Sequence, residues 1–256
     1  MASIFITGAA DGLGQAAAKD LVAKDHEVVL HARNEKRGED ALKGVPGAAD
    51  VLTADLSNID ETKELASKVN EVGRFDAIIH NAGVYRVSGK EIFAVNTLAP
   101  YILTCLIEPP KRLIYLSSGM HMQGRFGPEN FGSRSTTYSD SKLHVIMLCF
   151  AVARRWPEVF VNAVDPGWVP TKMGGAGAPD NFAEGIDTQV WLATSDDPLA
   201  KVSGRYFHHK NVARHNAEAD DIELQEQFLK LCEGITGIQL QGETTTNESD
   251  RNVQSR

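Results

Sequence analysis

The sequence predicts an α/β fold, in which a mostly parallel sheet of seven strands carries helices on both faces. Seven short β-branched or apolar runs alternate with seven longer segments of helical periodicity along the 256 residues. This alternation is typical of βαβ units and of a parallel sheet. The strand candidates are apolar almost throughout, as at residues 28–30 and 77–79, which is expected when helices cover both faces of a sheet.

The expected elements follow one another along most of the chain. We expect strands at residues 3–7, 26–32, 50–54, 75–80, 112–117, 159–164 and 202–207. We expect helices at residues 12–24, 35–43, 58–72, 91–108, 138–155, 182–194 and 220–233. A capping-box pattern at residues 57–60 predicts the start of the third helix. We therefore predict one domain over residues 1–240 and a polar, disordered tail over residues 241–256.

The composition excludes several classes of protein. A formal net charge of −8 disfavours a nucleic-acid partner, which needs a basic surface. The three cysteines, Cys105, Cys149 and Cys232, are odd in number and far apart, so we expect neither a disulfide framework nor a cysteine zinc site. Such cysteine usage indicates a reducing compartment, and we expect a cytoplasmic protein.

We expect neither a signal peptide nor a membrane span. The N-terminus lacks the basic and apolar regions of a signal peptide. The most apolar runs, residues 92–107 and 143–153, are shorter than the ~18 residues that a spanning helix needs. Both runs are apolar nearly all round, so each needs cover on the side that faces away from the sheet.

The first strand leads into a glycine-rich turn and a helix, which together form a candidate phosphate site. Residues 7–14 read Thr-Gly-Ala-Ala-Asp-Gly-Leu-Gly. Glycines let the backbone approach phosphates, and the free N–H groups of the helix N-terminus face them. A turn that only permits tight geometry is the alternative, but its place at the first strand–helix junction favours a dinucleotide.

The end of the second strand indicates which dinucleotide is preferred. A ribose-binding acid is expected there, but the position holds Ala32, followed by Arg33 in a charged run. A missing carboxylate and a guanidinium favour a 2′-phosphate, and therefore NADP(H) over NAD(H). The alternative is a solvated run of surface charge.

Tyr138 and Lys142 lie four residues apart on a predicted helix, so they share one face. A neighbouring cation favours the phenolate and lowers the pKa of a tyrosine, which would suit it to acid–base catalysis. The pattern alone is common by chance. Polar groups at other strand ends support it, because ligands bind at the carboxyl edge of such sheets. These groups are Asn81 after the fourth strand, Ser117 and Ser118 after the fifth, and residues 165–171 after the sixth.

Asn96 lies within an otherwise apolar helix. A buried amide costs free energy unless it is hydrogen-bonded, so we expect Asn96 to have a partner. A satisfied structural amide is compatible with a place in the active site.

Together these motifs resemble the short-chain dehydrogenase/reductase family, in family order across residues 3–207. The region from Tyr138 onward resembles retinol-dehydrogenase-like and carbonyl-reductase-like members. The resemblance implies a Rossmann-type, doubly wound sheet and an oxidoreductase that interconverts a carbonyl and an alcohol of a small molecule. Its matching positions are Thr7, Gly8, Gly12, Gly14, Asp55, Leu56, Asn81, Ala82, Gly83, Asn96, Ser118, Tyr138, Lys142, Pro166, Gly167, Val169 and Thr171.

The resemblance also implies roles for these positions. Tyr138 would exchange the proton, Ser118 would bind the reacting oxygen, and Lys142 would bind the nicotinamide ribose and lower the pKa of Tyr138. Asn96 would support a water relay to Lys142. The cofactor would be held by Thr7, Gly8, Asp11, Gly12, Leu13, Gly14, Arg33, Asp55, Leu56, Asn81, Ala82, Gly83, Tyr138, Lys142, Pro166, Gly167, Val169 and Thr171.

Two departures from the family pattern affect these roles. NADP-preferring members often carry a basic residue where this chain has Asp11, which argues against NADP(H). A long loop at residues 119–137 leaves Ser117, Ser133 and Ser135 as alternatives to Ser118, which we keep because it directly follows a strand. Altered chemistry on the same fold, such as C=N reduction, and a non-catalytic dinucleotide sensor are the competing functions.

The remaining expectations concern the substrate, metals and assembly. The glycine-rich residues 174–185 and the 119–137 loop would form a substrate lid. Trp168 and Met173 would line the pocket, with Met120, Met122 and Phe126 as an apolar wall. His208 and His209 would point to opposite faces of a strand without a third ligand, so we expect no metal site. Family members pair through the two apolar helices, which implies a homodimer or homotetramer.

Overall fold

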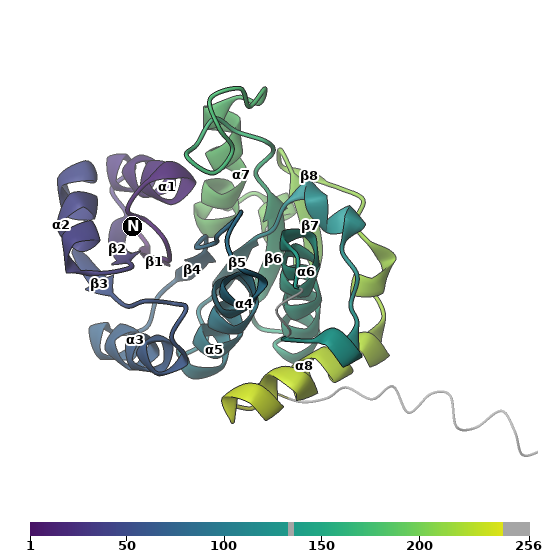
Figure 1. The fold of residues 1–256 in the computed structure, drawn as a ribbon. Coiled ribbons are helices and arrows are strands. Elements are labelled where there is room, and N and C mark those ends of the chain that lie inside the picture. The colour runs from purple at the N-terminus through teal and green to yellow at the C-terminus, as the bar shows by residue number, and fades with distance from the viewer. Residues whose placement is uncertain (133–135, 243–256) are drawn as a thin grey trace, which may run out of the picture.

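The computed structural model describes residues 1–132 and 136–242 and contains one eight-stranded sheet in the order β3-β2-β1-β4-β5-β6-β7-β8 (Figure 1). Neighbouring strands from β3 to β7 are parallel, and β8 pairs antiparallel with β7. The mostly parallel sheet is thus confirmed, with one strand more than predicted. The strands are β1 (Ser3–Ile6), β2 (Glu27–Ala32), β3 (Asp50–Thr53), β4 (Ala77–His80), β5 (Arg112–Leu116), β6 (Phe160–Asp165), β7 (Arg205–His208) and β8 (Asn211–Val212).

The eighth strand is a two-residue edge strand that the sequence pattern did not indicate. His209 and Lys210 connect β7 to β8 with φ angles of 47° and 61°. A two-residue hairpin with both central φ angles positive normally carries Asn or Gly, and this turn has neither. The usual sequence signal for the hairpin was therefore missing.

Helices cover both faces of the sheet, as predicted (Figure 1). Side chains alternate along β1, so Ile4 and Ile6 pack under α1, α2 and α7, while Phe5 packs on the opposite face with α3, α5 and α6. The inner strands β1, β2, β4, β5 and β6 are therefore buried on both faces, which explains their nearly continuous apolar sequences. The helices are α1 (Gly12–Ala23), α2 (Glu35–Gly44), α3 (Ile59–Val72), α4 (Gly89–Phe93), α5 (Ala99–Leu106), α6 (Tyr138–Arg155), α7 (Phe182–Thr194) and α8 (Ile222–Thr236).

The helix predicted at residues 91–108 is three consecutive segments. α4 begins after Ser88, whose side chain accepts a hydrogen bond from the Glu91 N–H, and a π-helical turn at Ala94–Leu98 joins it to α5. Pro100 lies in the first turn of α5 and has no N–H to donate to the preceding helical turn, which is the irregular π-turn. The π-turn, which surrounds Asn96, is a feature that is frequent at functional sites.

The apolar helix α6 receives its outer cover from the chain itself. α8 packs on α6 through Phe228, Leu229 and Cys232, all of which are buried in the same hydrophobic core as Ile146. The side of α6 that faces away from the sheet is thus covered within one chain and does not require a second subunit. None of the helices in the described residues is both long and apolar enough to cross a membrane.

Two further predictions need correction or lie partly outside the described residues. Helix α3 is capped by Asn58, which accepts hydrogen bonds from the N–H groups of Asp60 and Glu61, and not by Ser57, which bonds to Asp55. Of the predicted tail, residues 243–256 lie outside the described residues. Residue 241 is held, because the Trp156 indole N–H donates to its carbonyl oxygen at 2.7 Å.

Candidate active site

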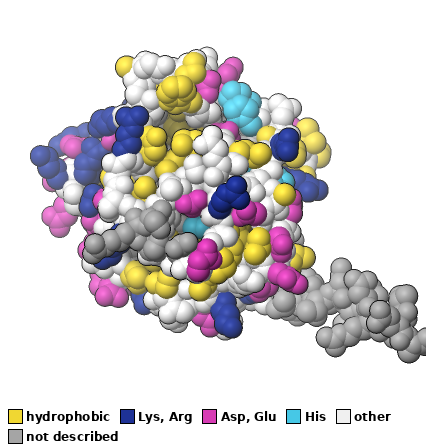
Figure 2. Space-filling model, turned by 45° about the vertical axis from the view of Figure 1, so that its right-hand side comes forward, with side chains coloured by type: hydrophobic (Ala, Val, Ile, Leu, Met, Phe, Trp, Pro, Cys, Tyr) yellow, Lys and Arg dark blue, Asp and Glu magenta, His cyan; other side chains and the backbone are white. Residues whose placement is uncertain are grey.

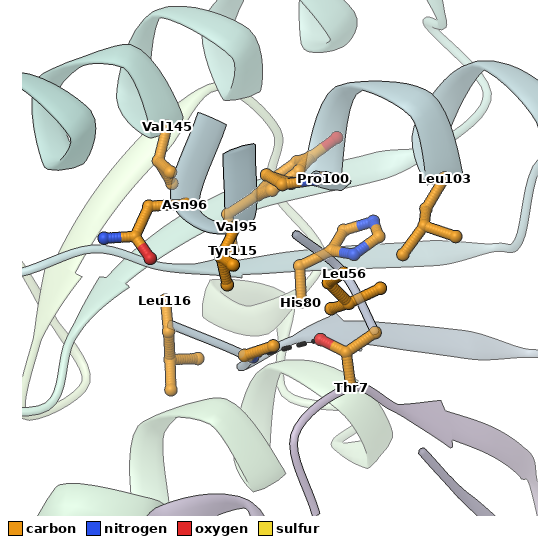
Figure 3. Close-up of a pocket in the computed structure, with 11 residues that line it drawn as sticks. Thr7, Leu56, His80, Val95, Asn96, Pro100, Leu103, Tyr115, Leu116 and Val145 are labelled. Atoms are coloured by element: carbon orange, nitrogen blue, oxygen red, sulfur yellow. Dashed lines mark hydrogen bonds between the residues drawn. The ribbon is translucent and has the colours of Figure 1, made fainter. Parts of the chain in front are cut away.

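One large cavity runs along the carboxyl edge of the sheet. Its volume is about 720 Å³, and its lining extends from the glycine turn to Tyr138 and on to the segment between β6 and α7. A second cavity, of about 10 Å³, lies behind it between Thr7, His80 and Asn96, and is too small for a dinucleotide or a substrate (Figure 3). The large cavity is therefore the candidate active site, as expected for the carboxyl edge of a parallel sheet.

The glycine turn is shaped by close backbone contacts at its first and last glycines. A Cβ on Gly8, where φ is +67°, would lie 2.8 Å from the Ala82 Cα, and a Cβ on Gly14 would lie 2.4 Å from the Asn81 amide nitrogen. The Asn81 amide donates to the carbonyl oxygens of Thr7 and Gly8 at 2.9 and 3.0 Å. These contacts bind the turn to the end of β4 and leave the N-terminus of α1 at the cavity, where it suits an anion.

His31 on β2, which was not among the predicted site residues, also holds this turn. Its Nδ1 accepts a hydrogen bond from the Gly8 N–H at 3.1 Å, so its Nε2 carries the proton and donates to the Ala54 carbonyl oxygen at 3.0 Å. Burial lowers the pKa of His31 to about 4, which keeps it in this neutral form. Only coordinates identify it, because a histidine inside an apolar strand carries no motif.

The basic groups at the end of β2 are paired with carboxylates. Arg33 donates to Asp55 at 2.9 Å, and Arg37, which the sequence analysis did not select, contacts Asp11 at 2.5 Å. Lys172 bonds to the same Asp11 oxygen at 3.0 Å. Burial alone would raise the pKa of Asp11. The hydrogen bonds from Lys172 and Arg37 have the larger combined effect, so the pKa of Asp11 is lowered. All five groups line the cavity, so Arg37 joins Arg33 as a candidate phosphate ligand.

Tyr138 and Lys142 lie on one face of α6, as the four-residue spacing predicted. The Lys142 ammonium lies 5.5 Å from the centre of the Tyr138 ring and donates to the Leu116 carbonyl oxygen at 2.8 Å. The Tyr138 hydroxyl faces the Met173 sulfur at 4.0 Å. Thr137 caps α6 through a capping box with Asp140, so the tyrosine occupies the rigid first turn of the helix.

The expected lowering of the Tyr138 pKa is absent from this structure. Burial raises that pKa to about 12, and the nearby charge of Asp165 adds to this effect, while a hydrogen bond from Ser118 opposes it. Burial also lowers the pKa of Lys142 to about 8. The resemblance implies that the Lys142 ammonium would bind the nicotinamide ribose and lower the pKa of Tyr138, whereas here this ammonium donates its hydrogen bond to the Leu116 carbonyl oxygen.

Ser118 suits the predicted role better than its neighbour. The Ser118 hydroxyl lies at the cavity within hydrogen-bonding reach of Tyr138. The Ser117 hydroxyl is buried and donates to the Lys142 carbonyl oxygen at 2.8 Å, so it joins β5 to α6. The other two alternatives, Ser133 and Ser135, lie outside the described residues.

Three of the predicted site residues lie behind the cavity wall. Asn96 is buried and has the partners we expected, namely both backbone groups of Val84, at 2.8 and 3.0 Å, and the Ser141 hydroxyl at 3.0 Å. Thr7 accepts a hydrogen bond from the Ala82 N–H at 3.0 Å, and Gly14 packs on Asn81. Figure 3 draws this bond as a dashed line that ends at the Thr7 hydroxyl. These residues support the site from behind. The others line the cavity: Gly8, Asp11, Gly12, Leu13, Arg33, Asp55, Leu56, Asn81, Ala82, Gly83, Ser118, Tyr138, Lys142, Pro166, Gly167, Val169 and Thr171.

Asp165, at the end of β6, is a second residue of the site to which no role was predicted. Its side chain is 15% exposed, lines the cavity, and lies 3.6 Å from the His208 Nδ1. A Cβ on Gly119 would lie 3.0 Å from its carboxylate, so this charge is close to the backbone that follows Ser118. Its negative charge raises the pKa values of both Tyr138 and Lys142.

The geometry of His208 and His209 corrects a prediction. Their rings stack at 3.9 Å and do not point to opposite faces, because β7 ends at His208 and His209 adopts a positive φ. Within residues 1–132 and 136–242, no three His, Cys, Asp or Glu side chains are grouped as a metal site requires.

The predicted substrate loops are also different from our expectation. Of the loop after β5, the residues near Ser118, up to Met120, line the cavity. Phe126 is buried against His144 and Phe228, and Met122 lies outside the cavity lining, so the apolar wall does not include them. The segment between β6 and α7 does line the cavity, through Trp168, Met173 and their neighbours.

Comparisons with known proteins agree with this architecture. A family model described as short chain dehydrogenase matches residues 2–181. The short-chain dehydrogenase chyC of Penicillium rubens is 42% identical over 256 residues, which cover 94% of this chain and 99% of that protein. Retinol dehydrogenase 14 of Mus musculus is 28% identical over 288 residues, which cover 92% of this chain and 86% of that protein.

Solved structures share the fold. An uncharacterized protein of Mycobacterium paratuberculosis has a TM-score of 0.79 at 23% identity, and the match covers 94% of this chain and 95% of that one. The Pseudomonas aeruginosa RhlG/NADP active-site complex has a TM-score of 0.67 at 20% identity, with coverage of 81% and 94%.

Proposed function

This chain belongs to the short-chain dehydrogenase family and is a nicotinamide-dependent oxidoreductase, and on that premise we propose that it interconverts a carbonyl and an alcohol of a small organic substrate with NADP(H). One observation carries the proposal. The Tyr138 and Ser118 hydroxyls and the Lys142 ammonium line the same cavity as the glycine turn. A dinucleotide held by that turn would extend toward the three groups.

The turn fits a dinucleotide on structural grounds. The close contacts of Gly8 and Gly14 leave no room for side chains. Gly12 has a φ of +56°, and a Cβ on it would lie 3.8 Å from the Thr171 Cγ2. Backbone N–H groups of the α1 N-terminus would bind the phosphates. When bound, the nicotinamide supplies or accepts a hydride.

The side chains of the protein handle the proton and the oxygen. Tyr138 donates its phenolic proton to the carbonyl oxygen during reduction and removes the hydroxyl proton during oxidation. Ser118 donates a hydrogen bond to the same oxygen and stabilises the charge that develops on it. A Tyr138 pKa of about 12 keeps the hydroxyl protonated at neutral pH, which is the form that reduction requires.

The preference for NADP(H) rests on Arg33 and Arg37. Both guanidinium groups line the cavity near the end of β2, where the adenosine ribose would lie, and a 2′-phosphate could bind between them. Asp11 and Asp55 compete for the same groups. The RhlG complex with NADP is a structural relative that is consistent with this preference.

Tyr138→Phe tests the proposal. We expect the variant to bind NADPH as the wild type does and to lose at least about 100-fold in kcat for carbonyl reduction, because only the proton donor is removed. NADPH oxidation with a panel of ketones and aldehydes measures this loss, and fluorescence titration measures binding. Equal turnover by the variant would show that Tyr138 is not the proton donor.

Two sequence-based expectations remain proposals. A homodimer or homotetramer is the first, although α8 already covers α6, and a monomeric mass by light scattering would contradict it. A cytoplasmic location is the second, and fractionation of cells that express the tagged protein tests it.

A further inference from the structure

We propose that the substrate is a carbonyl compound that carries an aromatic ring, and that this ring packs among Tyr85, Met120, Trp168 and Met173 while the carbonyl oxygen faces Tyr138. This inference rests on the proposed function and names its substrate class. All four side chains line the large cavity, and they come from three separate segments of the chain.

Tyr85 provides an aromatic surface next to the reacting group. Its ring centre lies 4.8 Å from that of Tyr138, and the two rings are tilted by 58°. The Arg86 guanidinium lies 5.2 Å from the centre of the Tyr85 ring and holds it through a cation–π contact. The group attached to the carbonyl carbon of a bound substrate would therefore lie near this ring.

Two thioethers add to this surface. The Met173 sulfur lies 4.0 Å from the Tyr138 hydroxyl, and Met173 is 42% exposed. Met120, on the loop after Ser118, is 38% exposed. Thioether sulfur makes favourable contacts with aromatic rings and adapts to their shape. Both methionines can therefore close on a ring that reaches Tyr138.

Trp168 is a large aromatic side chain that lies in the open at the cavity. It is 60% exposed, yet the chain holds it in place. Its indole N–H donates to the Gly174 carbonyl oxygen at 2.9 Å, and its backbone N–H donates to Asp180. In Figure 2 hydrophobic side chains gather at the top of the molecule, where Figure 1 shows the segment between β6 and α7. A fixed but exposed indole favours a ligand that covers it.

These contacts favour a ring over an aliphatic group of equal size. Either group would gain from the removal of apolar surface from water. Only an aromatic ring would add ring–ring contacts with Tyr85 and Trp168 and sulfur–ring contacts with the methionines. We therefore expect the wall to distinguish two substrates that differ only in the aromaticity of the ring.

A matched pair of ketones tests this expectation. Phenylacetone and cyclohexylacetone carry the same unconjugated methyl ketone and rings of similar size, so their carbonyl reactivity is comparable. We expect kcat/KM with NADPH to be about fivefold to tenfold higher for phenylacetone, mainly through KM. Tyr85→Leu and Trp168→Leu should each reduce this ratio by about threefold, because both ketones lose apolar contact with the wall and only phenylacetone also loses a ring–ring contact.

Two variants make the test specific. Tyr85→Phe keeps the ring and should retain the preference. Met122→Leu changes an exposed methionine outside the cavity lining and should leave both ketones unaffected. Equal kcat/KM values for the two ketones in the wild type, or equal losses for both in Tyr85→Leu, would overturn the aromatic substrate class. Failure of the wild type to reduce any ketone of the panel would overturn the proposed function itself, and the substrate class with it.

Discussion

The cofactor half and the substrate half of the cavity are built in different ways. In the cofactor half, backbone groups of the glycine turn are held by buried side chains, namely His31 and Asn81. In the substrate half, the surface consists of exposed side chains such as Trp168 and Met173. The first half is set by backbone shape and admits few changes. The second half is set by side chains that can vary without loss of the fold.

The largest expected effect comes from adding a methyl group to the rigid half. Gly8→Ala would place a Cβ 2.8 Å from the Ala82 backbone at a φ of +67°. We expect a loss of roughly 2–4 kcal/mol in the free energy of unfolding, and no measurable NADPH binding. Denaturant unfolding and fluorescence titration measure the two effects. Gly177→Ala, in the segment between β6 and α7, is the control, because a Cβ there meets nothing within 4 Å. Equal behaviour of both variants would remove the distinction between the halves.

Acid should destabilise the protein through buried histidines. Burial lowers the pKa values of His31, His80 and His144 to about 4, 3 and 4. The unfolded chain binds protons at these groups near pH 6.5. The contribution of the neutral histidines to the free energy of unfolding is therefore complete above pH 6.5 and is lost as the pH falls toward 4. We expect a loss on the order of 1–2 kcal/mol per histidine at pH 5. Melting temperatures from pH 8 to pH 5 test this, and a constant value would contradict neutral buried imidazoles.

Asp165 lies where the halves meet, and its charge should appear in the pH profile. Asp165 raises the pKa values of Tyr138 and Lys142, so Asp165→Asn should lower both. Reduction needs the protonated tyrosine. The alkaline limb of the pH profile of kcat for reduction should therefore move to lower pH by about one unit. The pH dependence of kcat measures this shift. Asp187→Asn removes a carboxylate outside the cavity lining and should leave the limb in place. An unmoved limb in Asp165→Asn would exclude the coupling.

The smallest expected effect concerns the choice of cofactor. Asp11→Asn would free Arg37 and Lys172 from an ion pair at the cavity. We expect the ratio of NADPH to NADH affinity to rise by about threefold to tenfold, because a 2′-phosphate no longer competes with a carboxylate. Asp20→Asn at the other end of α1 breaks the exposed pair with Lys24 and is the matched control. A ratio that falls in Asp11→Asn would contradict the assigned role of Arg37.

The same contrast explains what the sequence could and could not predict. The glycine turn and the pair of Tyr138 and Lys142 depend on the spacing of residues within one short segment, and a sequence gives that spacing directly. His31, Arg37 and Asp165 act through contacts between elements, which no local pattern records. Tyr85 belongs to the same class, since its place beside Tyr138 depends on how the loop after β4 meets the start of α6.

The fold, like the site, was predicted where a pattern lies within one segment and missed where it depends on contacts between segments. All seven predicted strands are present because their apolar runs are continuous. β8 was missed because its turn uses His209 and Lys210 in conformations that those residue types rarely adopt. The cover of α6 by α8 was missed because periodicity shows that a helix is buried and leaves open what buries it.

Two crystal structures with NADPH test the central claim most directly. One holds phenylacetone in the catalytically slow Tyr138→Phe variant, and the other holds a non-reducible analogue with the same ring in the wild type. The central claim predicts the substrate oxygen within about 3.2 Å of the Ser118 hydroxyl in both crystals and, in the wild type, within the same distance of the Tyr138 hydroxyl, with the nicotinamide facing the carbonyl carbon. A nicotinamide bound away from Tyr138, with the oxygen out of reach of both groups, would contradict it.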